Sequence, residues 1–477
     1  MEKNIKKMSK QDIVILMIYL GLYMIIGLIL LIKQPFGSPP DEYNRFLIPQ
    51  YIAEHGTIPN GYDEAIRIHG YGFSYGFQPI LPYMLQGYAM RFVRIFTTDF
   101  MTLLYTARSV DLFLGLLNAI GVFMLGRLWF MDRRFVWIFA VLATFLPQSI
   151  FVHTYVNTDS CCLLSITVML CAITQGMRRG FGIKTDCLLA LGVILCALSY
   201  YNAYGYILSC ILLFTASFIK RTDGRLRLDW KPFIKNGLFI AAVVLAAISW
   251  WFIRSAILYN GDFIGLRSRD VCAMQYATPE FRPDTRQTRQ RMGYSIFDMI
   301  FKSDFCNLTV LSFIAMYGAM AIPANIWLYR FYKYFLLITL VAMVVIRTKK
   351  IKRILPDSML EKKAMNIFFH ANMVFCALLP ALLSLWYSYT TDYQPQGRYI
   401  LPSLIPVMLY STKGLEKLIH FVIPEKLREK KLKTGTALSD RIINVMTIVV
   451  IVIIVAMLFW MVLGSALPYY RAHPIAD

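Results

Sequence analysis

The sequence is poor in charged residues, which make up 16% of its 477 positions, whereas soluble domains carry about 25%. Hydrophobic residues make up 57% of the chain. This composition excludes a soluble globule, a disordered protein and a collagen-like protein. It predicts an all-α fold, a polytopic transmembrane bundle of helices.

Motifs for nucleotide and zinc chemistry are also missing. The sequence has no GxxxxGK[ST] loop and no Gly-rich dinucleotide pattern, so use of ATP or a dinucleotide is not indicated. Its six histidines show no HExxH or paired spacing, so zinc chemistry is not indicated either. No internal repeat is visible in the chain.

The net charge of +21 arises from 49 basic and 28 acidic residues. In a soluble chain this excess would suggest nucleic-acid binding. Here most lysines and arginines fall in short segments between apolar runs, where the positive-inside rule places them on the cytoplasmic side, facing anionic lipids. We therefore expect membrane lipids as partners, and no nucleic acid.

Apolar runs long enough to cross roughly 30 Å of hydrocarbon predict about eleven spans. The first follows Lys3, Lys6, Lys7 and Lys10 and has no small-residue cleavage site after it, so we expect a retained signal anchor and a cytoplasmic N-terminus. An odd number of crossings places the C-terminus outside. The predicted spans are centred on residues 13–32, 110–126, 136–154, 161–176, 186–200, 204–219, 236–256, 324–346, 365–387, 398–412 and 442–463.

This layout divides the chain into three parts. Residues 1–412 form one transmembrane module with two long exterior loops, 33–78 and 259–305. Residues 413–441 form a basic cytoplasmic linker, and 442–477 form the last span and a short exterior tail. The apolar segment 77–96 is interrupted by proline and arginine, which favours a helix in the outer interface. Segment 294–323 is similarly ambiguous, and a true crossing by either would invert everything downstream.

Seven of the nine cysteines lie in apolar runs, where cysteine acts as a small buried apolar residue. Only Cys272 and Cys306 fall in a polar stretch. A disulfide between them is left open, because its geometry decides whether it can form.

The strongest local signal is the segment GSPPDEYNRF, immediately after the first span. Pro39 and Pro40 end the helix, and two adjacent carboxylates, Asp41 and Glu42, then lie at the membrane surface. A partly desolvated carboxylate can accept a proton from a hydroxyl group or hold a divalent cation. The alternative is that both residues only cap the helix that begins near Tyr43.

Two further polar segments fall on the same predicted side of the membrane. In HTYVNTDS, Asn157 and Asp159 could bind a metal together with Asp41 or orient a substrate hydroxyl, although Asp159 could equally cap the next helix. In TTDYQPQGRYILP, the guanidinium of Arg398 could clamp phosphate oxygens, and anchoring to lipid head groups is its alternative role.

Basic residues also crowd the exterior loop 259–305, contrary to the positive-inside tendency. Phosphate of a lipid-linked substrate, outer-leaflet head groups or local acidic side chains are the candidate partners. The residues are Arg267, Arg269, Arg282, Arg286, Arg289, Arg291 and Lys302.

A further charged pair lies at the start of the second predicted span. Arg108 and Asp111 are three positions apart, so on a helix they share one face and are expected to neutralise each other.

Taken in chain order, these motifs resemble the GT-C superfamily of integral-membrane glycosyltransferases, and are closest to bacterial polytopic members whose reactions are mostly unassigned. The resemblance rests on the signal anchor, the PDE motif, FQPILPY, the NTD turn and QGRYILP. It extends from the first span to about Leu409. The lack of a large soluble domain after the last span departs from oligosaccharyltransferase-like members.

Enzymes of that superfamily transfer a sugar from a polyprenyl-phosphate carrier at the extracytoplasmic face, commonly with an acidic residue in the first exterior loop. The resemblance implies such a donor, a glycan, lipid or protein acceptor, and a bacterial cytoplasmic membrane. It implies Asp41 as general base or metal ligand with Glu42 beside it, and Asp159 as a second acidic residue. A divalent cation, Mg²⁺ or Mn²⁺, is left open. The predicted substrate-binding residues are Asn157, Asp159, Gln396, Arg398 and Tyr399.

The main alternative is a transporter or flippase of a lipid-linked sugar. Such proteins tend to place ionisable residues near the bilayer midplane and to show two related halves. Here the acidic residues lie at helix ends on one side, which favours the enzyme. The sequence does not identify the sugar or the acceptor.

Overall fold

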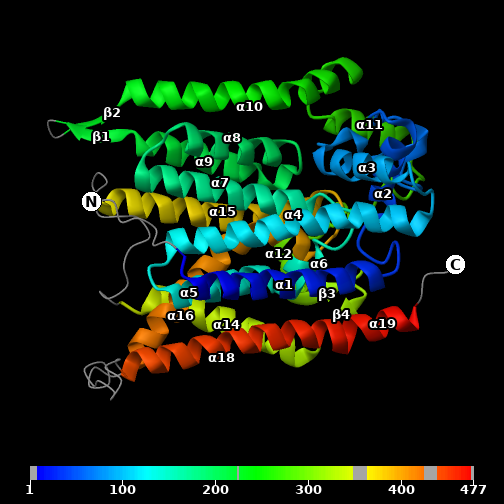
Figure 1. Cartoon of the computed structure of the whole chain (residues 1–477). Helices are drawn as coiled ribbons and strands as arrows, with labels where there is room; N and C mark the ends of the chain where they lie inside the picture. The colour runs from blue at the N-terminus through cyan, green and yellow to red at the C-terminus, as the bar shows by residue number, and fades with distance from the viewer. Residues whose placement is uncertain (1–7, 223–224, 348–361, 424–437, 474–477) are drawn as a thin grey trace.

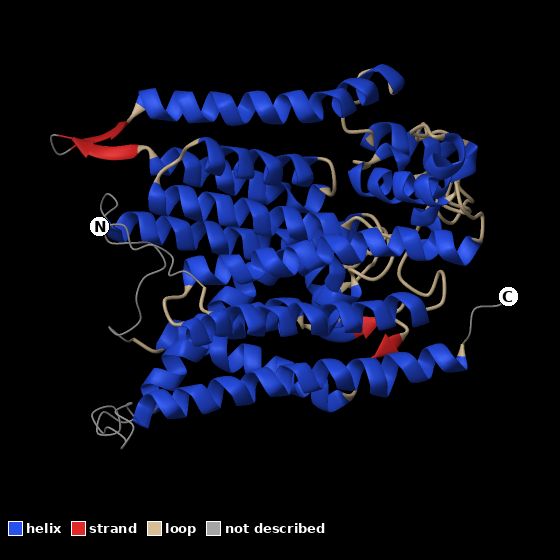
Figure 2. Cartoon of the chain, viewed as in Figure 1, coloured by secondary structure: helices blue, strands red, loops and turns tan. Residues whose placement is uncertain are grey.

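The computed structural model describes residues 8–222, 225–347, 362–423 and 438–473. Within these residues nearly all regular structure is helical, and the strands form two short antiparallel hairpins (Figure 2). The all-α prediction is confirmed. The elements are α1 (Lys10–Lys33), α2 (Glu42–His55), η1 (Glu64–Ile66), η2 (Tyr75–Phe77), α3 (Leu81–Val93), α4 (Phe100–Trp129), α5 (Arg133–Thr144), α6 (Pro147–Phe151), α7 (Asp159–Arg179), α8 (Ile183–Ala197), η3 (Tyr201–Ala203), α9 (Tyr204–Ser217), β1 (Ile219–Thr222), β2 (Arg225–Leu228), α10 (Trp230–Leu258), α11 (Leu266–Tyr276), α12 (Ile296–Lys302), α13 (Phe305–Ala315), β3 (Met316–Tyr317), β4 (Ile322–Pro323), α14 (Ile326–Val345), α15 (Lys362–Thr390), η4 (Gly397–Ser403), α16 (Leu404–Val422), α18 (Leu438–Met461), η5 (Val462–Ala466) and α19 (Leu467–Ala472).

Seven helices among the described residues are long and apolar enough to cross a membrane. They are α1, α4, α7, α10, α14, α15 and the continuous run α18–η5–α19. The other four predicted spans coincide with α5, α8, α9 and α16, of which α5, α8 and α9 have 12, 15 and 14 residues. The chain is an integral membrane protein, and the number of eleven crossings stays a prediction.

The two ambiguous segments contain no helix long enough to span. In 77–96 the helix is α3, with 13 residues, and in 294–323 the helices are α12 and α13, with 7 and 11. The predicted linker 413–441 begins inside α16, and residues 424–437 lie outside the described part of the chain.

The long helices run roughly side by side, with α7 buried at the centre of the bundle (Figure 1). Helix α7 packs on α4, α8 and α9. Its polar side chains are satisfied across these contacts: the Thr167 hydroxyl donates to Asn118 Oδ1 at 2.7 Å, and Trp129 Nε1 donates to the Thr174 hydroxyl at 3.2 Å. Neighbouring helices therefore meet through hydrogen bonds as well as apolar contacts, as expected inside a membrane bundle.

The two predicted exterior loops meet at one end of the bundle, where Figure 1 shows α2, α3 and α11 together, opposite the hairpin of β1 and β2. The Thr278 N–H donates to the Gly70 carbonyl at 2.9 Å, and the rings of Tyr71 and Phe281 stack with centroids 4.4 Å apart. Gly72 has φ +70°, and a side chain there would collide with the backbone of Ala277. A left-handed residue without Cβ is thus needed where the two loops touch.

Cysteine pairing does not contribute to this contact. Cys272 is buried and donates to the Gly72 carbonyl at 3.3 Å, whereas Cys306 is exposed, and both are free thiols. The disulfide that the sequence left open is absent.

A fully buried ion pair holds the start of α2 against α4. Arg108 Nε donates to Glu42 Oε1 at 2.8 Å and Nη2 donates to Oε2 at 2.6 Å, with both side chains 0% exposed. The rest of each group is also satisfied, because the backbone N–H groups of Gly37 and Val156 donate to Glu42 and Arg108 Nη1 donates to two carbonyls at the end of α1. This bidentate pair ties together segments that are far apart in the chain.

The predicted pairing of Arg108 with Asp111 is therefore wrong. Asp111 accepts a hydrogen bond from Gln86 Nε2 at 2.7 Å instead. Helical spacing brought the two residues to one face of α4, but the Glu42 carboxylate accepts from Nε and Nη2 of Arg108, and carbonyls at the end of α1 accept from Nη1.

We predict that Glu42→Gln lowers the free energy of unfolding by about 3–5 kcal/mol, because it leaves the buried Arg108 without a counter-charge. Unfolding of the purified protein in detergent would measure this. The matched control is Glu54→Gln, which removes a partly exposed partner of Arg94 at 3.5 Å and should cost less than about 1 kcal/mol. Equal losses in the two variants would contradict the role assigned to the Glu42–Arg108 pair.

Candidate functional site

Asp41 is held in a backbone conformation that non-glycine residues seldom adopt. It precedes α2 with φ 61° and ψ 6°, and its side chain makes no capping hydrogen bond to the helix. The alternative that Asp41 merely caps α2 is thus not supported. A left-handed Asp costs free energy, and its carboxylate is turned away from the helix and toward η4.

Arg398, from η4, meets this carboxylate. Its Nη2 donates to Asp41 Oδ2 and to the Tyr399 hydroxyl, the latter at 3.1 Å, while Nη1 donates to the Pro40 carbonyl at 3.2 Å. The Arg398 side chain is 3% exposed and that of Asp41 is 33% exposed. The acid therefore faces open space while the guanidinium lies behind it.

The position of η4 depends on a close backbone contact with α13. A side chain at Gly397 would overlap the backbone of Phe313, and the Gly397 N–H donates to the Ser312 hydroxyl at 2.7 Å. Only glycine allows the chain to pass α13 at this distance, so Gly397 places the next residue, Arg398, at the site.

A second buried arginine, Arg45, lies one helical turn after Asp41. It is 4% exposed, and its Nη1 donates to the Tyr83 and Thr158 hydroxyls, both at 3.1 Å. Its guanidinium also lies 4.7 Å from the centre of the Tyr75 ring. These contacts hold a positive charge beside Asp41.

The NTD turn reaches the same place. Asn157 is buried and structural, because its Oδ1 accepts from the Asp159 and Ser160 N–H groups and its Nδ2 donates to two carbonyls. Asp159 is 6% exposed at the start of α7, and the charges of Arg45, Arg398 and Asp41 all act on its carboxyl group. The structure thus brings Asp41, Asp159 and Arg398 together.

The other predicted site residues have distinct positions. Tyr399 bonds to Arg398 and to Gln394, and Gln396 lies beside it with a buried amide oxygen that has no partner within the described residues. Glu42 does not face the site, because Arg108 and two backbone N–H groups occupy its oxygens. Its geometry corresponds to positioning Asp41 rather than to contact with a substrate.

The charges around Asp41 decide its protonation. Burial alone would favour the neutral acid, but the positive charges of Arg398 and Arg45 outweigh burial and lower the pKa of the Asp41 carboxyl below its ordinary value. The Tyr75 hydroxyl nearby has a raised pKa, chiefly because it is buried and also because of the Asp41 charge. Asp41 is therefore ionised at neutral pH and Tyr75 keeps its proton.

Several polar atoms of this cluster have no partner within the described residues: Arg45 Nε, Arg398 Nε and Asp159 Oδ2. Unsatisfied buried N–H groups are costly, so sites that contain them are suited to a ligand that supplies the missing acceptors. Two guanidinium groups with free N–H donors near one carboxylate are suited to an anion such as phosphate.

Residues of the two predicted exterior loops lie next to the cluster. The hydroxyl of Tyr71 has a raised pKa, first because of burial and then because of the charges of Asp392 and Asp41, while Arg286 acts in the opposite direction. Local acids partner several of the basic loop residues: Arg269 pairs with Asp270 and Lys302 with Asp298, at 2.8 Å and 2.5 Å. Local acidic side chains thus compensate part of the positive charge of loop 259–305.

A metal ion is only weakly supported by the donor set. Asp41 and Asp159 are the two carboxylates that were predicted as ligands, and no group of three or more His, Cys, Asp or Glu side chains suited to a metal occurs among the described residues. Both carboxylates already lie in the field of Arg45 and Arg398, which disfavours a divalent cation. The residues present do not fit Mg²⁺ or Mn²⁺ well.

Arg45, Tyr75 and Gly397 are site residues that the sequence motifs did not single out. A signal for Arg45 was present, because it stands four positions after Asp41 and so on the same side of the helix that the motif begins. Tyr75 and Gly397 carry no such signal, since their importance arises from contacts with distant segments.

No family model and no curated protein matches the chain. Solved structures match nearly its full length at low identity. Oligosaccharyltransferase AglB from Archaeoglobus fulgidus, in complex with an inhibitory peptide and a dolichol-phosphate, is 14% identical with a TM-score of 0.49 and covers 92% of this chain and 55% of its own. An A. fulgidus oligosaccharyltransferase with Zn and sulfate is 15% identical with a TM-score of 0.48, covering 92% and 52%.

ArnT from Cupriavidus metallidurans, bound to undecaprenyl phosphate, is 12% identical with a TM-score of 0.49 and covers 95% of this chain and 72% of its own. The chain thus spans about half the length of the oligosaccharyltransferases and nearly three quarters of ArnT.

Proposed function

We propose that this protein is a membrane glycosyltransferase that moves a sugar from a polyprenyl-phosphate carrier to a hydroxyl acceptor at the extracytoplasmic face. The observation that carries the proposal is the Asp41 carboxylate, partly exposed and flanked by the buried guanidinium groups of Arg45 and Arg398. A base beside two cations matches a reaction that takes a proton from one reactant and releases a phosphate from the other.

In the proposed reaction the Asp41 carboxylate accepts the proton of the acceptor hydroxyl while that oxygen attacks the anomeric carbon. The bond between the anomeric carbon and the phosphate oxygen breaks, and its electron pair stays on the phosphate. Free N–H groups of Arg45 and Arg398 stabilise the charge on the departing phosphate. Because attack and departure occur on opposite faces of the carbon, the configuration is inverted.

In this proposal the acceptor binds beside the contact between the two predicted exterior loops. Tyr71 and Phe281 form a stacked aromatic pair there, and Phe73 lies next to Tyr71 with ring centroids 6.1 Å apart. Aromatic faces beside hydroxyl and guanidinium groups are suited to holding a sugar ring and its polar substituents. A glycan acceptor is therefore favoured over a protein segment, which would need a longer groove.

A transfer assay tests this function. Membranes containing wild type or Asp41→Asn at matched expression are incubated with radiolabelled sugars on a panel of polyprenyl-phosphate donors. Loss of the base should lower transfer about 10²- to 10⁴-fold, since the variant keeps the size of the side chain and cannot accept the proton. Glu64→Gln, an exposed acid in the same exterior loop, is the matched control and should keep full activity.

Equal transfer by Asp41→Asn and wild type would remove Asp41 from the mechanism. Transfer absent with every donor, in wild type as well, would contradict the enzyme and favour movement of a lipid-linked sugar across the membrane.

Arg398→Ala should raise the Michaelis constant for the donor about tenfold or more while changing that for the acceptor much less, because the guanidinium contacts the phosphate in this proposal. Arg398→Lys keeps the charge but loses the planar guanidinium, so its Michaelis constant for the donor should lie between those of wild type and Arg398→Ala. Steady-state kinetics with each substrate varied in turn would measure this. An unchanged donor constant in Arg398→Ala would contradict the phosphate role.

The pH profile gives an independent readout. Because Arg398 and Arg45 lower the pKa of Asp41, kcat/KM should stay level on the acid side down to below about pH 4, the usual range of an Asp carboxyl, and fall only when Asp41 takes up a proton. In Arg45→Gln one of the two charges is gone, so the acid limb should move to higher pH. A limb at the same pH in both proteins would show that another group governs it.

A further inference from the structure

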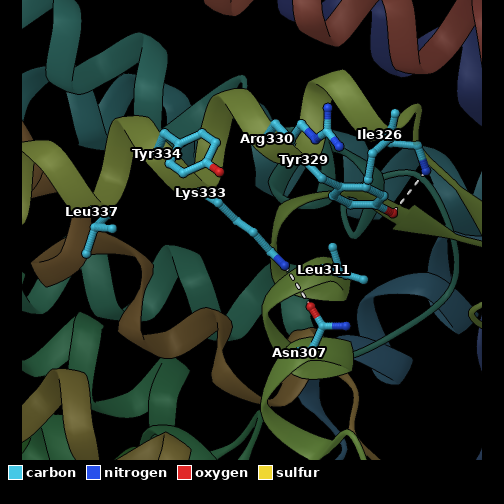
Figure 3. Close-up of a pocket in the computed structure, with 9 residues that line it drawn as sticks. Asn307, Leu311, Ile326, Tyr329, Arg330, Lys333, Tyr334 and Leu337 are labelled. Atoms are coloured by element: carbon cyan, nitrogen blue, oxygen red, sulfur yellow. Dashed lines mark hydrogen bonds between the residues drawn. The ribbon is translucent and has the colours of Figure 1, made fainter.

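A groove of about 580 Å³ opens between α13 and α14 (Figure 3). Leu311 and Leu337 form apolar walls, and Lys333 extends from α14 toward α13, where its Nζ donates to Asn307 Oδ1 at 2.7 Å. Arg330 lines the edge of the groove, and its guanidinium lies 4.8 Å from the centre of the Trp327 ring.

Neither cation has a carboxylate within ion-pair distance among the described residues. Lys333 uses a neutral amide and Arg330 an aromatic face, which leaves both positive charges uncompensated. An ammonium group has three donors, so Lys333 has two more to offer a ligand.

The groove faces lipid rather than the interior of the protein. The apolar side chains on the same stretch of α14 point outward, with Ile326, Leu337 and Tyr334 exposed by 56%, 58% and 61%. Helix α14 has 20 residues, and Arg330 and Lys333 lie within about 10 Å of its start. They therefore sit at the depth of one leaflet's head groups and upper chains.

This leaflet is the outer one in the predicted orientation. Helix α14 starts beside β4, and β4 packs against η5 just before α19. These elements lie at the end of the bundle opposite to the start of α1 (Figure 1). The positive-inside rule does not explain two cations here, since it concerns residues on the cytoplasmic side. Cations in a lipid-facing position at this depth need an anionic partner.

We propose that the groove binds an anionic phospholipid of the outer leaflet. Its phosphate contacts the Lys333 ammonium, with Arg330 as a second cation at the edge, and one acyl chain lies along Leu311 and Leu337. The aromatic rings of Tyr329 and Tyr334 border the site at the level where such rings favour the head-group region.

A phospholipid is a better occupant than the sugar carrier because α13 separates the groove from the Asp41 cluster. Asn307 and Leu311 face the groove, whereas Ser312 accepts the N–H of Gly397, next to Arg398, on another side of the same helix. A phosphate on Lys333 would thus lie behind the wall of the proposed active site and could not reach Arg398. This inference is independent of the proposed reaction.

Native mass spectrometry of the purified full-length protein, titrated with phosphatidylglycerol, phosphatidylcholine or undecaprenyl phosphate, tests the site. Lys333→Gln should weaken phosphatidylglycerol binding about fivefold, the factor for one cation near an anionic lipid, and leave phosphatidylcholine binding unchanged. Lys333→Arg should keep the affinity. Lys33→Gln, an exposed lysine at the end of α1, is the matched control and should behave as wild type.

Asn307→Asp provides a second variant. The new carboxylate keeps the contact to Lys333 and neutralises the charge of the Lys333 ammonium, so this variant should also bind phosphatidylglycerol more weakly. Unchanged phosphatidylglycerol affinity in both Lys333→Gln and Asn307→Asp would overturn the proposal. A loss confined to undecaprenyl phosphate would overturn it in favour of a carrier site.

Discussion

The buried ion pair between Glu42 and Arg108 is the constraint on which the geometry of the candidate site depends. Two charges removed from water are tolerated only when geometry and additional hydrogen bonds compensate for lost hydration, and here every outer edge of both groups is occupied. The pair joins the end of α1, the start of α2, the middle of the chain at Val156 and helix α4. The pair fixes residue 42 next to Asp41, which makes no capping hydrogen bond and whose carboxylate binds Arg398 of η4.

The partner of Asp41 is positioned by a separate set of contacts. Arg398 lies 357 positions later in the chain, and η4 carries it to the site because Gly397 passes close to the backbone of α13. The site is thus assembled where independently packed segments end, at the same end of the bundle. Such an arrangement allows the helices to supply rigidity in the membrane while the residues that face solvent come from their exterior ends.

The fold class could be predicted from the sequence, whereas individual contacts of the candidate site and the lengths of several helices could not. Composition and apolar runs predicted a helical membrane protein, and the PDE, NTD and QGRYILP segments were predicted to lie on the same side of the membrane. Which of two adjacent carboxylates faces the site was not predictable, because that choice depends on Arg108, 66 positions away, and on a positive φ. Likewise, hydropathy marked residues 136–154, 186–200 and 204–219 as spans, but the lengths of α5, α8 and α9 depend on where tertiary packing ends each helix.

The ion pair between Asp41 and Arg398 links donor binding to acid–base chemistry in the proposed reaction. In the free protein the guanidinium stabilises the carboxylate and keeps its pKa low, which makes Asp41 a weak base. A donor phosphate would compete for the same guanidinium, and each N–H that turns to the phosphate removes part of that stabilisation. The pKa of Asp41 would then rise, and its affinity for the acceptor's proton would increase only after the donor is bound. Binding of the donor thus makes Asp41 a stronger base in a site whose net charge is near zero beforehand. The site remains a poor catalyst when the carrier is absent.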